Sequence, residues 1–159
     1  MSRPRVSAGI AAAAFLVAIG GCAQSEGQPA PQAESIPAET WRTDEDAAFA
    51  EAKKSGRHVV VDFRAMWCEP CKEVEAILAQ DAVFSEITKS FVPLEFDISG
   101  LTPDDNELKA KYKAFELPAV IFVSASGDEL GRIDGVVSTS DAFLSQMRGI
   151  LDKHPAPDS

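Results

Sequence analysis

Short apolar runs alternate with segments of helical periodicity along most of this 159-residue chain. Residues 58–63 contain the run Val-Val-Val-Asp-Phe, which is typical of a strand buried on both faces. Similar apolar runs predict strands at 91–98 and 119–123. A Ser-Gly-Asp turn after the third run predicts an antiparallel hairpin with 129–133.

Helix signals occupy the segments between these strands. Three of them combine a capping residue with acids in the first turn, and two are marked by apolar residues at helical spacing. The predicted helices cover about 44–55, 68–80, 81–89, 103–112 and 139–151. Helices and strands alternate up to the hairpin, which predicts an α/β fold. We expect a central mixed sheet of about four strands, flanked by helices on both faces.

The first 22 residues have the layout of an export signal. Arg3 and Arg5 precede an uncharged apolar run at 8–19, and Ile-Gly-Gly then leads to Cys22. This ending resembles a bacterial lipoprotein box, so we interpret 1–21 as a signal peptide and Cys22 as the lipidated residue. An ordinary cleaved signal, or an uncleaved anchor with a chance cysteine, is the alternative.

The segment that follows is polar and proline-rich, and we interpret 22–40 as the lipidated cysteine and a flexible tether. One domain is expected at 41–153, followed by a disordered tail at 154–159. Lipidation would place the domain on the periplasmic side of the bacterial envelope, where disulfides persist. Ala23 does not match the inner-membrane retention signal known in some bacteria, which slightly favours the outer membrane.

Composition is that of an ordinary globular protein, with 45% hydrophobic residues and a formal net charge of -10. This charge argues against a nucleic-acid or anionic-lipid surface. With Cys22 assigned to the export signal, Cys68 and Cys71 are the two cysteines of the predicted domain.

These two thiols lie in Trp67-Cys68-Glu69-Pro70-Cys71, where a predicted strand gives way to a helix. A helix N-terminus lowers the pKa of a thiol, so we expect Cys68 to be the solvent-accessible nucleophile. Cys71, one turn later, would face inward and attack what is bonded to Cys68. A zinc site would need further ligands, and a purely structural disulfide gains little from so short a loop.

Two carboxylates are candidates for proton transfer at Cys71. Asp62 lies within the apolar strand, where burial would be costly without a task, although a strand end reaching solvent is the alternative. Glu75 is four residues after Cys71 and therefore on the same helical face, unless it is simply a solvated helix acid. The negative charge of Glu69 either opposes the lowering of the Cys68 pKa by the helix N-terminus, or Glu69 is simply an exposed loop residue.

Leu117 and Pro118 precede the third strand. The proline is either a trans residue at a strand edge or part of a cis bond in a tight turn. We expect Trp67 to pack beside the dithiol, where its apolar face would border a substrate.

The motif Val-Asp-Phe-Arg-Ala-Met-Trp-Cys-Glu-Pro-Cys-Lys, with Leu-Pro before a strand, resembles the thioredoxin superfamily. It is most similar to the C-terminal periplasmic domain of DsbD-type thiol:disulfide interchange proteins. The resemblance spans about 41–153 and implies a thioredoxin-like fold. It also implies a Cys68–Cys71 redox pair modulated by Asp62 and Glu75. The substrate groove would then lie at Leu117 and a cis Pro118.

We therefore expect an enzyme of thiol–disulfide exchange, acting as a reductase of partner-protein disulfides. Electrons would come from a membrane reductase, and the protein would be a monomer that needs no cofactor or metal. A disulfide oxidase or isomerase is the alternative, as is a non-redox binding module of the same fold.

Overall fold

The computed structural model of the protein describes residues 40–156. The elements follow in the predicted order, with ends that differ from the prediction by a residue or two. The elements are α1 (Glu45–Ser55), β1 (His58–Arg64), α2 (Glu69–Leu78), α3 (Asp81–Ser90), β2 (Phe91–Asp97), α4 (Pro103–Tyr112), β3 (Ala119–Val123), β4 (Glu129–Asp134) and α5 (Ser140–Leu151). Five helices and four strands of the described chain thus confirm the predicted α/β fold class.

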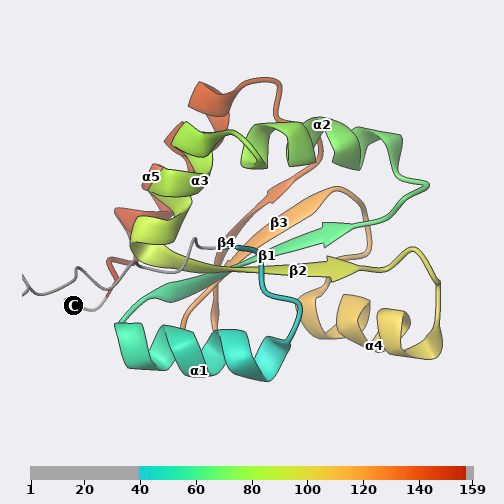
Figure 1. The fold of residues 1–159 in the computed structure, drawn as a ribbon, viewed down its shortest axis with the longest axis horizontal. Coiled ribbons are helices and arrows are strands. Elements are labelled where there is room, and N and C mark those ends of the chain that lie inside the picture. Colours follow the sequence, from blue (N-terminus) through green and yellow to red (C-terminus); the bar gives the residue numbers. More distant parts are fainter. Residues whose placement is uncertain (1–39, 157–159) are drawn as a thin grey trace, which may run out of the picture. The chain divides into compact units, whose positions relative to one another are not determined.

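The four strands form one mixed sheet in the order β2-β1-β3-β4 (Figure 1). Strand β1 pairs in parallel with β2, whereas β3 is antiparallel to both β1 and β4. Strands β1, β2 and β4 therefore end at the same edge of the sheet at which β3 begins. Every residue of β3, and every residue of β1 except the last, is buried, as the apolar runs predict.

Helices cover both faces of the sheet. Helices α1 and α4 lie on one face, and α2, α3 and α5 lie on the other (Figure 1). Aromatic contacts fill each interface: Phe63 meets Tyr112 of α4 at 5.6 Å between ring centroids. On the opposite face, Phe122 meets Phe91 at 5.0 Å and Phe143 of α5 at 6.4 Å. No helix within residues 40–156 is long and apolar enough to cross a membrane.

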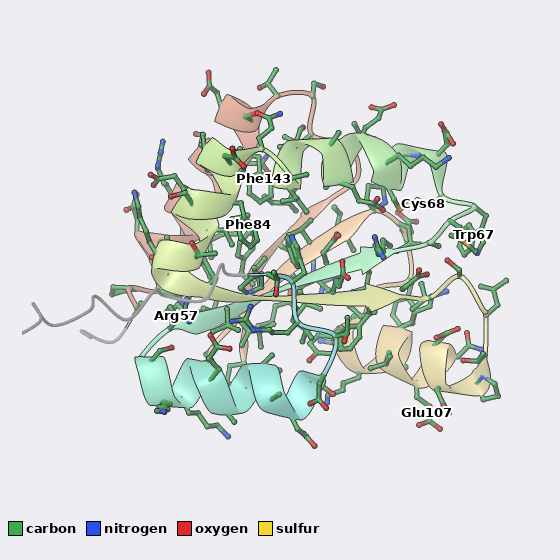
Figure 2. The ribbon with its side chains drawn as sticks, viewed as in Figure 1. Arg57, Trp67, Cys68, Phe84, Glu107 and Phe143 are labelled. Carbon is green, nitrogen blue, oxygen red and sulfur yellow. A yellow bond between two sulfur atoms is a disulfide. The ribbon has the colours of Figure 1, made fainter. Side chains whose placement is uncertain are left out.

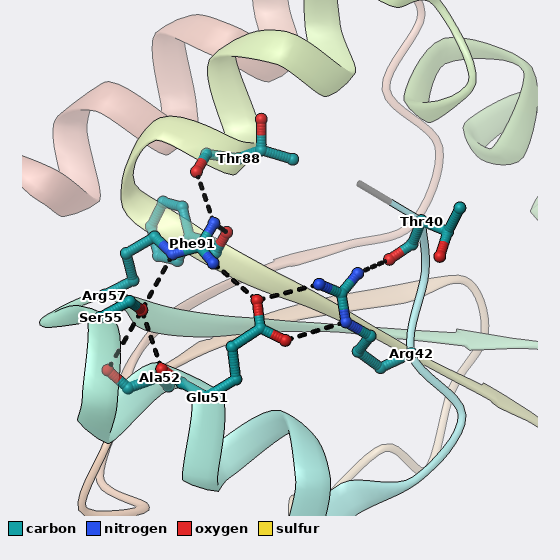
Figure 3. A network of polar contacts seen from close by, with 8 residues as sticks. All are labelled: Thr40, Arg42, Glu51, Ala52, Ser55, Arg57, Thr88 and Phe91. Atoms are coloured by element: carbon teal, nitrogen blue, oxygen red, sulfur yellow. Dashed lines mark hydrogen bonds and ion pairs between the residues drawn. The ribbon is translucent and has the colours of Figure 1, made fainter. Parts of the chain in front are cut away.

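A polar network ties α1 to the rest of the domain (Figure 3). Glu51 accepts hydrogen bonds from Arg42 Nη2 at 2.9 Å and from Arg57 Nη2 at 2.7 Å. Arg57 Nη1 also donates to the carbonyl oxygen of Thr88 at the end of α3, at 2.9 Å. Because Arg57 directly precedes β1, this network supports the edge of the sheet opposite to the Cys-x-x-Cys motif (Figure 2).

Candidate active site

The two cysteines form a disulfide at the N-terminus of α2, with their Cα atoms 5.3 Å apart. Cys68 is the N-cap residue, and its Sγ accepts a hydrogen bond from the backbone N–H of Cys71 at 3.2 Å. Pro70 lies in the first turn, where its missing N–H costs no helical hydrogen bond. The strand-to-helix junction predicted for the motif is therefore present.

Both cysteines are buried in this disulfide form, with exposed fractions of 5% for Cys68 and 1% for Cys71. The expectation that Cys68 is accessible to solvent is therefore wrong for the disulfide form, although Cys68 is the more exposed of the two cysteines. The physical reason is that both belong to the hydrophobic cluster that contains Phe63 and Ala119 at this edge of the sheet. A partner that reacts with Cys68 must therefore contact the side chains around it in order to bring its own sulfur close to Cys68 Sγ.

Trp67 lies beside the disulfide and is 54% exposed (Figure 2). Its indole Nε1 donates to the carbonyl oxygen of Ser99 at 3.3 Å, and the N–H of Met66 donates to Ser99 Oγ at 2.7 Å. Ser99 follows β2, so these bonds attach the loop carrying the cysteines to the β2–α4 connection. Sequence reasoning missed Ser99, because an isolated loop serine carries no signal of this kind.

The peptide bond between Leu117 and Pro118 is cis, as the family resemblance implies. The carbonyl oxygen of Pro118 accepts a hydrogen bond from the N–H of Gly135 at 3.0 Å. This bond joins the connection before β3 to the connection after β4. Leu117 is half-buried and packs against the hydrophobic cluster that contains both cysteines. Leu117 and Pro118 therefore lie at the same edge of the sheet as the disulfide.

Asp62 is buried within β1, with 4% of its surface exposed, so the alternative of a strand end in solvent is wrong. Burial, and then the nearby charges of Glu75 and Glu95, raise the pKa of Asp62 to about 7, while Arg64 opposes the increase. A carboxyl group with such a pKa can both take up and release a proton near neutral pH.

Asp62 and Glu75 share one cavity of about 190 Å³. Its lining residues are Trp41, Asp62, Arg64, Glu75, Leu78, Ala79 and Glu95. Glu75 is partly exposed and lies 4.0 Å from Arg64, so it is not a freely solvated helix acid. Glu69, by contrast, is an exposed residue whose carboxylate pairs with Lys72 at 2.6 Å.

Arg64 and Glu95 are site residues that sequence reasoning missed. Glu95 stands opposite Asp62 in the parallel pairing of β1 and β2, and Arg64 lies two residues after Asp62. Without the register of the two strands, nothing in the sequence connects them. Among the residues that the structure describes, no cluster of histidines, cysteines and acids has the arrangement of a metal site.

A fold of this topology, with a Cys-x-x-Cys disulfide at the start of α2, defines the class of thioredoxin-type thiol–disulfide oxidoreductases. Residues 45–150 match the family model described as a thioredoxin-like domain, and the chain belongs to this family.

Curated relatives point to one branch of the family. The chain is 35% identical over 95 residues to the thiol:disulfide interchange protein DsbD 1 of Pseudomonas aeruginosa, covering 56% of this chain and 16% of that protein. It is 33% identical over 115 residues to DsbD of Ralstonia nicotianae, covering 72% and 19%. The chain thus spans less than a fifth of the length of these two relatives.

Solved structures agree with the match. The C-terminal domain of Neisseria meningitidis DsbD in the oxidised form superposes with a TM-score of 0.60 at 26% identity, covering 69% of this chain and 98% of that one. A thioredoxin from Thermus thermophilus gives a TM-score of 0.63 at 26% identity, covering 74% and 92%. The chain is therefore a thioredoxin-like domain protein that is similar to DsbD proteins in sequence and to the C-terminal domain of DsbD and to thioredoxin in structure.

Proposed function

We propose that the protein is a cell-envelope reductase that passes electrons from the Cys68–Cys71 dithiol to disulfides of partner proteins. The supporting observation is the position of the exposed apolar side chains. Among the described residues, the large hydrophobic side chains that are exposed are Met66, Trp67, Leu101, Phe115 and Val136, and we call them the apolar rim.

All five rim residues lie at the edge of the sheet that carries the disulfide. They come from four separate connections: β1–α2, β2–α4, α4–β3 and β4–α5. Exposed apolar surface is costly in water, and a collection of it around a reactive group marks a contact surface for another molecule. Because the rim is spread over four connections at this edge, it favours a protein segment, which can contact several of them at once, as the partner.

The backbone of Leu101 supports this interpretation. This residue has a φ of 51°, in the left-handed region that costs a residue with a Cβ atom about 1 kcal/mol. The capping box between Thr102 and Asp105 holds the turn at the start of α4. An exposed leucine maintained in this conformation is more readily explained by contact with a partner than by packing.

The chemistry begins with the thiolate of Cys68 in the reduced protein. Its sulfur attacks one sulfur of the partner's disulfide, forming a mixed disulfide and releasing the other partner sulfur as a thiolate. Cys71 then loses its proton, and its sulfur attacks Cys68 Sγ. This step forms the Cys68–Cys71 disulfide and releases the second partner sulfur, so the partner gains the two electrons that the dithiol gives up. These exchanges require no organic cofactor.

Asp62 and Glu75 are proposed to handle the proton of Cys71 in the second step. The pKa of about 7 suits Asp62 for this task, because the carboxylate is present at neutral pH and still binds a proton readily. Glu75, partly exposed in the same cavity, would pass the proton to solvent.

Electrons must return to the disulfide before another cycle, and a membrane reductase is the proposed donor. The direction of flow is checked by the reduction potential of the pair against glutathione. A value near that of thioredoxin, about −270 mV, fits a reductase, whereas one near −120 mV would favour the oxidase alternative. We further propose that the protein acts as a monomer.

The lipid anchor at Cys22, which lies outside the described residues, is also a proposal. In a bacterial host that processes lipoproteins, the protein should sediment with membranes. Replacing Cys22 with serine should abolish the incorporation of labelled palmitate, because the acyl chains are lost. Palmitate labelling followed by immunoprecipitation measures this, and label retained by the serine variant would count against lipidation at Cys22.

Replacing Cys71 with serine should trap partner proteins on Cys68. The resolving thiol is then absent, so the mixed disulfide accumulates and appears as a higher band on non-reducing gels. The matched control replaces both Cys68 and Cys71, and it should give no such band. The binding-module alternative predicts instead that this double variant keeps its full function in cells.

A variant of the apolar rim tests whether the rim binds the partner in the trapping experiment. On the Cys71→Ser background, replacing both Leu101 and Phe115 with serine should lower the yield of trapped partner about tenfold, because apolar contacts are lost. The reaction of Cys68 with a small disulfide reagent should not change. An equal yield with and without the rim side chains would exclude the rim as the docking surface.

A further inference from the structure

Arg64 occupies the centre of a group of carboxylates beside Asp62. Its guanidinium lies 3.6 Å from Glu95, 3.8 Å from Asp97 and 4.0 Å from Glu75. The buried Nε–H of Arg64 has no hydrogen-bond partner among the described residues. The guanidinium is thus shared between α2 and β2 by charge, and its Nε–H makes no hydrogen bond to either element.

The fold itself produces this arrangement. Asp62 and Arg64 are two residues apart in β1 and therefore project from the same face of the sheet. In the pairing with β2, Asp62 stands opposite Glu95 and Arg64 stands opposite Asp97. Glu75 joins them from α2, which covers that face (Figure 1). Among the residues that line the cavity, Arg64 is the cation beside three carboxyl groups.

The charged side chains around Asp62 come from several elements, and their charges differ in sign. The acids Glu75 on α2 and Glu95 on β2 raise the pKa of Asp62, and Arg64 at the end of β1 lowers it. Asp97 and Lys72 border the neighbouring hollow, which Arg64 and Glu75 also line. Val120, opposite Asp62 on β3, contributes no charge. Among the residues that line the cavity, Arg64 is therefore the group whose charge favours the ionised carboxylate of Asp62.

We propose that Arg64 is a positioning residue for the second step of the exchange, keeping Asp62 able to accept the proton of Cys71 at neutral pH. This inference rests on the proposed function, because it assigns Arg64 a role only through the Cys71 reaction. In that step the Cys71 proton passes to the Asp62 carboxylate, and the Cys71 sulfur bonds to Cys68 Sγ. The partner's sulfur leaves with the electron pair of the broken bond.

Two substitutions of opposite sign test the charge of the cavity. Arg64→Gln removes the cation, so Asp62 should be less ionised at a given pH. Glu95→Gln removes an acid and should have the reverse effect. A single nearby charge moves a buried carboxyl pKa by about one unit or more. We therefore expect the acid limb of the Cys71 step to move about one pH unit upward in Arg64→Gln and downward in Glu95→Gln.

The measurement uses the reduced full chain with Cys22→Ser and dithiobis(nitrobenzoic acid). The first release of thionitrobenzoate reports attack by Cys68, and the second reports attack by Cys71 on the mixed disulfide. Stopped-flow traces across the pH range give the rate of the second release separately. On the acid limb, Arg64→Gln should be about tenfold slower than the parent, because a shift of one unit changes the carboxylate fraction tenfold there.

Two further variants separate charge from packing. Arg64→Lys keeps the positive charge and should leave the acid limb close to that of the parent. Arg148→Gln makes the same change in net charge at an exposed site on α5, where Arg148 pairs with Glu86 at 4.0 Å. It should have no effect, since its charge is outside the cavity. Thermal unfolding of each variant confirms that the domain is folded.

The outcomes distinguish this inference from the proposed function. If the parent shows no second release, the exchange chemistry itself fails. If the parent shows it and the Arg64→Gln profile overlays the parent's, the role of Arg64 is overturned. An Arg64→Lys profile displaced as far as that of Arg64→Gln would likewise overturn it, because the charge would then not be the cause.

Discussion

Replacing Cys68 with serine is expected to lower the rate of insulin-disulfide reduction by about a thousandfold or more. A hydroxyl group is not ionised near neutral pH and cannot replace the thiolate that forms the mixed disulfide. The Cys71→Ser variant should behave differently, because it retains the attacking sulfur. It should react once with dithiobis(nitrobenzoic acid) and release a single thionitrobenzoate.

Insulin turbidity with dithiothreitol as the electron donor measures the multiple-turnover rate. All forms carry Cys22→Ser, so the parent retains two of the three thiols in the chain, Cys68 and Cys71, and each variant retains one of them. Substantial insulin reduction by Cys68→Ser would contradict the assignment of the nucleophile. A rapid second release from Cys71→Ser would contradict the assignment of the resolving thiol.

Replacing Asp62 with asparagine should stabilise the protein at alkaline pH while slowing the Cys71 step. The pKa of Asp62 is about 7 in the folded protein and 3.8 as the ordinary value. Between about pH 4 and 7 the folded state therefore holds a proton that the unfolded state has released, and stability falls as pH rises through this window. Above it, the ionisation of Asp62 costs about 4 kcal/mol, because each unit of pKa difference corresponds to about 1.4 kcal/mol.

Urea unfolding at pH 5 and pH 8 measures this effect. The advantage of Asp62→Asn over the parent should be about 2 kcal/mol larger at pH 8, because more of the cost of ionisation is then present. Glu107→Gln is the matched control, since Glu107 is an exposed acid on α4 (Figure 2). An advantage that does not vary with pH, or one that the control shares, would rule out the ionisation of Asp62 as its source.

The same substitution connects stability with activity. If Asp62 accepts the Cys71 proton, Asp62→Asn should reduce the second thionitrobenzoate release and leave the first nearly unchanged. A buried acid that destabilises the fold and accelerates one step is a known trade-off at functional sites.

Much of the fold could be predicted because its signals are local. The apolar run at 58–63 and the capping signals at the starts of the helices at 103–112 and 139–151 depend on neighbouring residues, and each predicted element is present. The family resemblance, also carried by a short motif, correctly implied the cis bond before Pro118. The burial of Cys68 was not predicted, since it depends on side chains from β1 and β3 that meet at the sheet edge.

The sequence by itself determined the class of chemistry: two thiols at a strand-to-helix junction, with a buried carboxyl group six residues before the first. Only the tertiary structure decided what surrounds them. Glu95 lies opposite Asp62 because of the register in which β1 and β2 pair. The apolar rim forms because four connections meet at one edge of the sheet. The reason is physical, because periodicity specifies which face of an element is apolar, whereas charge and contact between elements depend on how strands pair.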